Sequence, residues 1–283
     1  MLKAFKYRRV NHFLWSSLAE SELYFAEPHR LSDPYDCQVD ILDTLRRAAN
    51  ETQDARQRTL QKLLGTDVFL KNIQDDILKF GVCCFSRTLL NTVMWSHYAD
   101  GHRGVCLYYE IPASFIDDPA NGIFGYSPVK YGDDALFDWL VTTDALETLL
   151  PLDAAIEVMK MALTVKGNDW AYEDEARIIR PSGGTMKIRP AFLKQICFGL
   201  RTPAAHKERL RRIVRGTYDN VQFAEIRHEG RKDFGIAAYE RFESDVEEEI
   251  REAEEQGEKE GITGRQIFWA VVAFLILVYF LSS

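Results

Sequence analysis

The sequence lacks a regular cysteine pattern, a glycine-rich phosphate loop and any internal repeat. Without the phosphate loop, a nucleotide-binding site of the P-loop or Rossmann type is not predicted. An odd number of cysteines without a framework spacing is not typical of a disulfide-stapled secreted domain. We therefore expect reduced thiols in a cytoplasmic protein. The irregularly spaced cysteines are Cys37, Cys83, Cys84, Cys106 and Cys197.

Net charge is also nearly absent from most of the chain. The 283 residues carry a formal charge of −8, but residues 243–260 alone hold ten acidic and two basic side chains. Residues 1–242 hold 33 acidic and 32 basic side chains. Because nonspecific nucleic-acid binding depends on excess positive charge, we expect no bulk nucleic-acid binding. The N-terminal segment has charges every few residues and no apolar core, so we expect no signal peptide.

One long apolar run is present, at residues 267–281, which read IFWAVVAFLILVYFL. With its flanks it covers residues 264–283, a length within the range that spans a bilayer. Lys259 and Arg265 precede the run, so the positive-inside rule places the preceding domain in the cytoplasm. We expect a soluble domain over 1–242, an acidic helical linker over 243–263 and a single-pass tail anchor over 264–283. The alternatives are a buried C-terminal helix and an interfacial helix, and the latter is disfavoured because the run has no polar face. The oligomeric state stays open.

Short strand patterns alternate with helix patterns in residues 1–242. Strand patterns, rich in β-branched and aromatic residues and bounded by turn residues, cover 4–8, 23–26, 82–87, 104–110, 129–131, 176–180, 195–199, 221–226 and 235–239. Helical spacing of apolar residues covers 12–20, 41–64, 67–80, 92–99, 134–149, 153–164 and 204–215. The order is not a strict strand–helix alternation. It predicts a single mixed α+β domain with a largely antiparallel or split sheet.

Five segments interleave charged or polar residues with aromatic ones. They are FKYRR at 5–9, LSDPYD at 31–36, CFSR at 84–87, MWSHYADGHRGV at 94–105 and WAYEDEARII at 170–179. In this order they resemble the DUF2971 family, an uncharacterised family of mainly bacterial proteins, over roughly residues 5–200. Ser32 stands where that family usually has Asn, and either residue can stabilise a turn. The resemblance implies no established chemistry.

The last of these segments carries two carboxylates and a guanidinium. If it is extended, a period of two places Glu173, Glu175 and Arg177 on one face. They form either a structural ion-pair ladder or a site that stabilises positive charge developing on a sugar carbon. An Arg on the first strand, a Ser on a middle strand and a late E-x-E is the order seen in one class of ADP-ribosyltransferases. Arg8, Ser86 and the two glutamates occur in that order.

The resemblance to those transferases implies a role for each residue type, with NAD as the substrate. Arg8 would grip the pyrophosphate, Ser86 would brace the nicotinamide pocket, and Tyr98 or Trp95 would stack on the nicotinamide ring. Glu175 would hold a ribose hydroxyl and favour the oxocarbenium-like transition state, and Glu173 would orient the acceptor. The candidate NAD-contacting residues are Arg8, Tyr7, Trp95, Tyr98 and Arg177.

Other arrangements stay open. His97 is a candidate general acid or base. A metal held by His97, His102 and Cys106 is disfavoured because glycines interrupt the helix between them. Asp33 and Asp36 could instead join the two glutamates as metal ligands in a nuclease-like site.

Three function classes follow. The first is a membrane-anchored, NAD-consuming, ADP-ribosyltransferase-like effector, for example in bacterial defence, acting on a macromolecular acceptor. The second is a non-enzymatic sensor or adaptor that binds a small molecule and signals through the membrane helix. The third is a metal-dependent nuclease, which the near-neutral domain disfavours. The first class requires Arg8, Ser86 and Glu175 to line one cavity.

Overall fold

The computed structural model describes residues 1–65, 76–228 and 236–240. Its strands are β1 Leu2–Arg8, β2 Glu22–Phe25, β3 Gly81–Ser86, β4 Val105–Ile111, β5 Gly125–Pro128, β6 Lys130–Tyr131, β7 Val165–Lys166, β8 Glu175–Arg180, β9 Gly184–Lys187, β10 Leu193–Phe198, β11 Gln222–His228 and β12 Ile236–Glu240. Its helices are α1 His12–Ala19, α2 Ile41–Glu51, α3 Asp54–Leu64, α5 Thr92–His97, α6 Ala113–Ile116, α7 Ala135–Thr142, α8 Pro151–Ala162 and α9 Ala204–Thr217.

The strands form one large sheet and two small ones. The large sheet has eight strands in the order β12-β11-β10-β4-β1-β3-β8-β5, and the small sheets pair β2 with β9 and β6 with β7. Within the large sheet only β10 and β11 run parallel, and α9 is the crossover helix that such a connection needs. The fold is therefore α+β with a mixed, mostly antiparallel sheet, which confirms the predicted class.

Most predicted elements are present, with three kinds of difference. The helix predicted over 41–64 is interrupted after α2, because Thr52 is extended and its hydroxyl donates to the carbonyl of Ala48 at 2.8 Å. The helix predicted over 134–149 ends at Thr142. Strands β5, β7 and β9 and helix α6, each of at most four residues, were not predicted. Only a 3₁₀ turn, Ile77–Lys79, is described in the helix predicted over 67–80, since residues 66–75 lie outside the described part.

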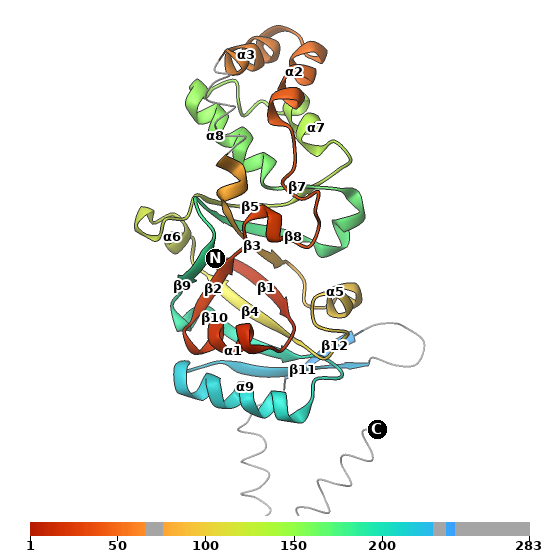
Figure 1. Ribbon diagram of the computed structural model, residues 1–283, viewed down its shortest axis with the longest axis vertical. Helices are drawn as coiled ribbons and strands as arrows, with labels where there is room; N and C mark the ends of the chain where they lie inside the picture. The colour runs from red at the N-terminus through yellow and green to blue at the C-terminus, as the bar shows by residue number, and fades with distance from the viewer. Residues whose placement is uncertain (66–75, 229–235, 241–283) are drawn as a thin grey trace, which may run out of the picture.

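The elements are stacked along the long axis of the molecule (Figure 1). Helices α2, α3, α7 and α8 gather at one end around their own apolar core, whose members include Ile41, Leu45, Leu140 and Val158. Helices α1 and α9 lie at the opposite end and cover one face of the sheet through a second core that includes Leu14, Leu18 and Leu210. Helix α5 packs on the other face through Trp95. The sheet thus connects two separately packed ends.

The sheet is loosely joined in its middle. Strands β1 and β4 share seven register pairs, whereas β1 and β3 share one, Phe5 with Ser86. The other end of β3 pairs instead with the end of β2, where Ala26 and Val82 exchange both backbone hydrogen bonds, at 2.8 and 2.9 Å. A space therefore opens between β1, β3 and the chain that follows β2. This space positions the site described below.

No helix in residues 1–65 or 76–228 is both long and apolar enough to cross a bilayer. The predicted linker and tail anchor, residues 243–283, lie outside the part of the chain that the structure describes.

The turn between α5 and β4 depends on Gly104. A Cβ atom at this position would lie 2.3 Å from the carbonyl oxygen of Arg8 and 2.8 Å from that of Ala99, both of which are backbone atoms. The amide of Gly104 donates to Ala99, and its carbonyl accepts from Gly199 and from the hydroxyl of Thr202. Side chains larger than hydrogen are therefore excluded here by close backbone approach.

We predict that Gly104→Ala lowers the free energy of unfolding by about 1–3 kcal/mol, the usual cost of overpacking. The control is Gly167→Ala, because a Cβ atom at Gly167 meets nothing within 4 Å. Urea unfolding followed by fluorescence checks both variants. Equal midpoints for the two variants would contradict the close approach at Gly104.

Candidate functional site

A cavity of about 230 Å³ lies in the space between β1 and β3. Its other walls come from the chain after β2, from α5 and from the 3₁₀ helix η4, Asn168–Glu173, which leads into β8. Six of the nine residues predicted to act in catalysis or NAD binding line this cavity: Tyr7, Arg8, Ser86, Tyr98, Glu173 and Glu175. The structure thus brings together Arg8, Ser86 and Glu175, as the first function class requires.

Strand register explains part of this convergence. Phe5 lies opposite Ser86, and Ser86 lies opposite Glu175, in neighbouring antiparallel strands. Side chains at directly opposed positions point to the same face of a sheet, so these three form one row across β1, β3 and β8. Glu173 is not extended as predicted. It ends η4, and the left-handed residue Asp174 (φ 43°) turns the chain into β8.

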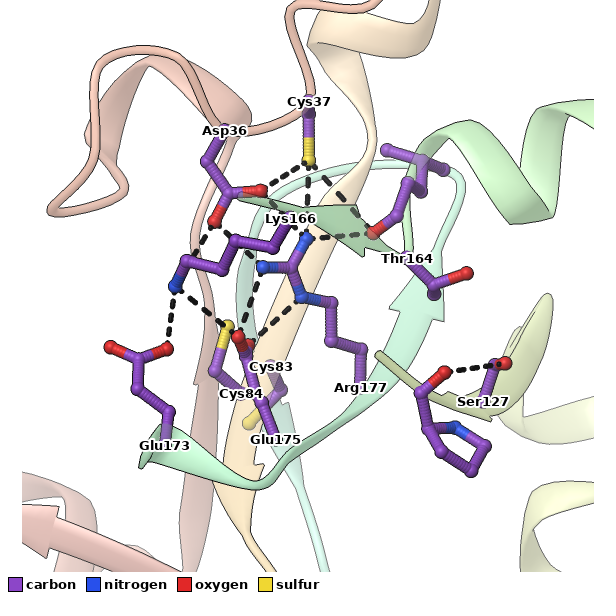
Figure 2. Close-up of polar contacts among 12 residues, drawn as sticks. Asp36, Cys37, Cys83, Cys84, Ser127, Thr164, Lys166, Glu173, Glu175 and Arg177 are labelled. Atoms are coloured by element: carbon purple, nitrogen blue, oxygen red, sulfur yellow. Dashed lines mark hydrogen bonds and ion pairs between the residues drawn. The ribbon is translucent and has the colours of Figure 1, made fainter. Parts of the chain in front are cut away.

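Behind the cavity lies a buried cluster of ionic side chains centred on Arg177 (Figure 2). Its guanidinium is fully buried. It donates to both oxygens of Asp36, at 2.6 and 2.9 Å, and to both oxygens of Glu175, at 2.9 and 3.0 Å. A further hydrogen bond of 2.8 Å reaches the carbonyl of Leu163. This bidentate geometry suits the planar guanidinium and ties three separate segments of the chain together.

Lys166 is the second cation of the cluster, and it is also buried. Its ammonium lies 2.5 Å from Glu173, 3.4 Å from Glu175 and 3.5 Å from Asp36. Figure 2 shows it between the three carboxylates. Two cations therefore face three carboxylates. With all five groups ionised, the cluster carries one formal negative charge at the wall of the cavity.

The two glutamates differ in their pKa. Burial alone would raise the pKa of Glu175, but the charge and hydrogen bonds of Arg177, followed by Lys166, lower it to about 2. Burial raises the pKa of Glu173, with Lys166 opposing the shift. Two neighbouring carboxyl groups whose environments separate their pKa values are typical of an acid/base pair. Glu175 is the member that stays ionised at neutral pH, and Glu173 is the member whose proton affinity is raised.

Helix α5 closes the site over Glu173. The hydroxyl of Tyr98 donates a short hydrogen bond to Glu173. Asn91, which caps the start of α5, also donates to the carbonyl of Tyr172 at 2.6 Å. His97 lies 3.1 Å from the hydroxyl of Tyr172 through Nδ1. Burial, together with the carboxylate of Glu173, raises the pKa of Tyr98, so this phenol stays protonated as a donor.

Arg8 is placed differently from the buried cations. It is half-exposed, and no hydrogen bond or ion pair engages its side chain among the residues described. It also lines a second cavity of about 330 Å³, which shares Tyr7, Arg8, Ser32 and Tyr98 with the first. The remaining walls of the second cavity are Arg9, Asn11 and His97. The two cavities are neighbours, with an available guanidinium between them.

Three predicted residues lie outside the first cavity. Trp95 is completely buried, and its indole donates to the carbonyl of Leu89 at 2.9 Å. Its ring is therefore part of the core and is not accessible for stacking on a ligand. Arg177 is enclosed by its partners, so it reaches a ligand only through them. His97 lies on the wall of the second cavity, where it is exposed.

Lys166 was not predicted as a site residue, and Asp36 was considered only as a possible metal ligand. Asp36 does meet Glu173 and Glu175, as the metal hypothesis supposed, but the nitrogens of Lys166 and Arg177 occupy the space between the carboxylates. Across residues 1–65 and 76–228, no group of three or more His, Cys, Asp or Glu side chains could hold a metal ion. In the sequence, Lys166 is a single charged residue that stands beside apolar residues, just after a predicted helix. That pattern is too short to identify a buried cation.

The five cysteines are all free thiols, and four are buried. Cys37 is part of the ionic cluster, where its Sγ lies 3.4 Å from Asp36 and from Arg177. Burial raises the pKa of this thiol to about 12. It is therefore protonated and unreactive at neutral pH.

Comparison with known proteins identifies one similarity. A family model described as "Protein of unknown function (DUF2971)" matches residues 94–178. This stretch runs from α5 to β8. It contains the long segment at 94–105 and all but the last residue of the one at 170–179, and it includes Tyr98, Lys166, Glu173, Glu175 and Arg177. No curated protein and no solved structure matches the chain.

We predict that Glu175→Gln lowers the free energy of unfolding at pH 7 by about 3–5 kcal/mol, because it removes one partner of the buried Arg177. The stabilisation from Glu175 is complete above its usual pKa of 4.5 and is lost as the pH falls toward about 2. The difference from the wild type should therefore shrink over this range. Urea unfolding at several pH values measures it.

The matched control is Glu157→Gln, which removes a carboxylate from the ion pair with Lys160 at the surface. Such pairs contribute about 0–1 kcal/mol. An equal loss of stability in both variants, or a difference that does not depend on pH, would contradict the assigned role of Glu175.

Proposed function

We propose that this chain is a membrane-anchored cytoplasmic effector that consumes NAD through an ADP-ribosyltransferase-like site. The observation that carries the proposal is the convergence of Arg8, Ser86 and Glu175 on one cavity. The sequence order of these residues was weak evidence, since it occurs by chance in many chains. That all three side chains line one cavity is a stronger requirement than their order in the sequence, and these three residues meet it.

In the proposed reaction, the bond between the ribose carbon and the nicotinamide nitrogen breaks. The electron pair leaves with nicotinamide, which becomes neutral, and positive charge develops on the ribose. A hydroxyl group of an acceptor or of water forms the new carbon–oxygen bond and loses its proton to Glu173. The carboxylate of Glu175 stabilises the oxocarbenium-like transition state. The separated pKa values of the two glutamates suit this division of roles.

Substrate binding follows from the two neighbouring cavities. The first, beside Ser86 and Tyr98, would hold the nicotinamide and its ribose. Arg8, between the cavities, would bind the pyrophosphate, and the second cavity would take the remaining nucleoside, beside Arg9. A guanidinium is well suited to phosphate because it presents parallel donors.

The ionic cluster would supply preorganisation. Both oxygens of Glu175 are fixed by Arg177, and Lys166 holds Glu173 and Glu175 in one orientation. A carboxylate that is fixed before the substrate arrives needs no reorganisation when charge develops.

The same contacts favour a second candidate, a non-enzymatic sensor. Because the oxygens of Glu175 are occupied by Arg177 and Lys166, its charge is already balanced. A site of this kind could bind a ligand without turning it over. NAD would then be a signal that is relayed to the membrane helix.

We predict that the full chain in detergent micelles releases nicotinamide from NAD, and that Glu173→Gln lowers kcat by about 100-fold, the usual contribution of a general base. Its affinity for NAD, measured by calorimetry, should remain. Arg8→Ala should weaken NAD binding at least tenfold through the loss of a charged hydrogen bond. Arg103→Ala, which removes an exposed arginine paired with Asp100, should leave both quantities unchanged.

Two outcomes separate the alternatives. Binding of NAD that depends on Arg8, without turnover in any variant or with any acceptor, supports the sensor. Absence of NAD binding to the wild type overturns both proposals.

We further predict that the full chain sediments with membranes and resists extraction at high salt and at alkaline pH. A variant without residues 264–283 should be released, because the uncharged run at 267–281 with its flanks is long enough to stay in the hydrocarbon core. Fractionation followed by immunoblotting measures the distribution. Unchanged sedimentation of the shortened variant would contradict the anchor.

A further inference from the structure

Helix α9 lies at the end of the molecule opposite helices α2 and α3 (Figure 1), and one of its faces is basic and exposed to solvent. It contains five basic side chains and one acidic side chain. Arg209, Arg212 and Arg215 recur at spacings of three residues and are all exposed. Residues three apart are neighbours on a helix surface, so these arginines form one stripe.

The other side of α9 is already occupied. Leu210 and Val214 are buried in the core beneath α1 and the sheet. Arg211 lies over the rings of Phe198 and Phe223. Lys207 pairs with Glu225 at 2.7 Å. Arg209 also lies over the ring of Trp15 on α1, at 4.5 Å. The stripe is thus on the outer side of α9, with one member that also contacts α1.

A strongly acidic segment follows the sheet at this end. Residues 243–260 carry ten acidic and two basic side chains. Strand β12 ends at Glu240, which pairs with Ala224 near the start of β11. Helix α9 ends at Thr217, five residues before β11 begins. The chain therefore leaves the sheet near the carboxyl end of α9, and residue 243 is three residues further on.

We propose that residues 243–260 dock on the basic face of α9 formed by Arg209, Arg212 and Arg215. The charges are complementary, since the segment has a net charge of −8 and α9 a net charge of +4. The lengths also agree. Fourteen residues of α9 span about 21 Å, and eighteen residues in the helix predicted for the segment span about 27 Å.

Covalent attachment favours this occupant over an anionic membrane surface. The segment is joined to the domain by two residues, so it is held at a high effective concentration next to α9. Docking would neutralise the three arginines and prevent them from contacting phospholipid headgroups. It would also set how far the domain stands from the anchor.

Proteolysis of the full chain in detergent micelles, with a protease that cleaves after glutamate, tests the proposal. Docking should slow cleavage within residues 243–260 at about 50 mM salt, and about 500 mM salt should remove the protection because it screens surface charges. Arg209→Glu/Arg212→Glu should accelerate cleavage at low salt about tenfold. Adding Glu248→Arg/Glu249→Arg to that variant should restore protection at the remaining glutamates of the segment.

The matched control is Arg58→Glu/Lys62→Glu, which makes the same charge change on exposed positions of α3, at the opposite end of the molecule. It should leave cleavage of the segment unchanged. Circular dichroism confirms that each variant is folded. Equal cleavage of the wild type and of the α9 variant at low salt overturns the proposal. So does protection that appears only when vesicles of anionic phospholipid are added, which would assign the stripe to the membrane.

Discussion

The double hydrogen-bonded pairing of Arg177 with Asp36 and Glu175 is the constraint on which the site depends. It joins the chain after β2, the start of β8 and the end of α8. A fully buried guanidinium is costly unless its donors are satisfied. The segments that satisfy it must therefore come together, and they bring Glu173 and Lys166 with them. The cavity wall therefore forms where the charge of the buried Arg177 guanidinium is neutralised.

The same requirement explains why the carboxylates are unequal. Glu175 faces the guanidinium directly and stays ionised, whereas Glu173 accepts from the ammonium of Lys166 and the phenol of Tyr98. Neighbours that differ in charge give two like groups different proton affinities. An acid/base pair therefore arises from an asymmetric set of partners. Function at this site, whether catalytic or sensory, depends on keeping that asymmetry.

The fold was more predictable from the sequence than the site. Strands such as β3 and β8 have dense β-branched or aromatic patterns, and their ends were predicted within one residue. Glu175 and Arg177 share a face because a strand alternates, so their pairing followed from spacing alone. Asp36 and Lys166 join them through contacts 141 and 9 residues apart in the chain, and no local pattern encodes such distances. The burial of Trp95 was likewise decided by packing on β4 and β10, not by its neighbours in the sequence.

The single register pair between β1 and β3 divides the large sheet into two parts. One part of the large sheet, from β12 to β1, is continuous through several pairs at each step, and so is the other part, from β3 to β5. The two parts meet at Phe5 and Ser86. The space between β1 and β3 is therefore bounded by one backbone pair and by the side chains packed around it, not by a continuous ladder. Arg8 belongs to the first part and Glu175 to the second, so the separation of these two side chains across the cavity depends on this one junction.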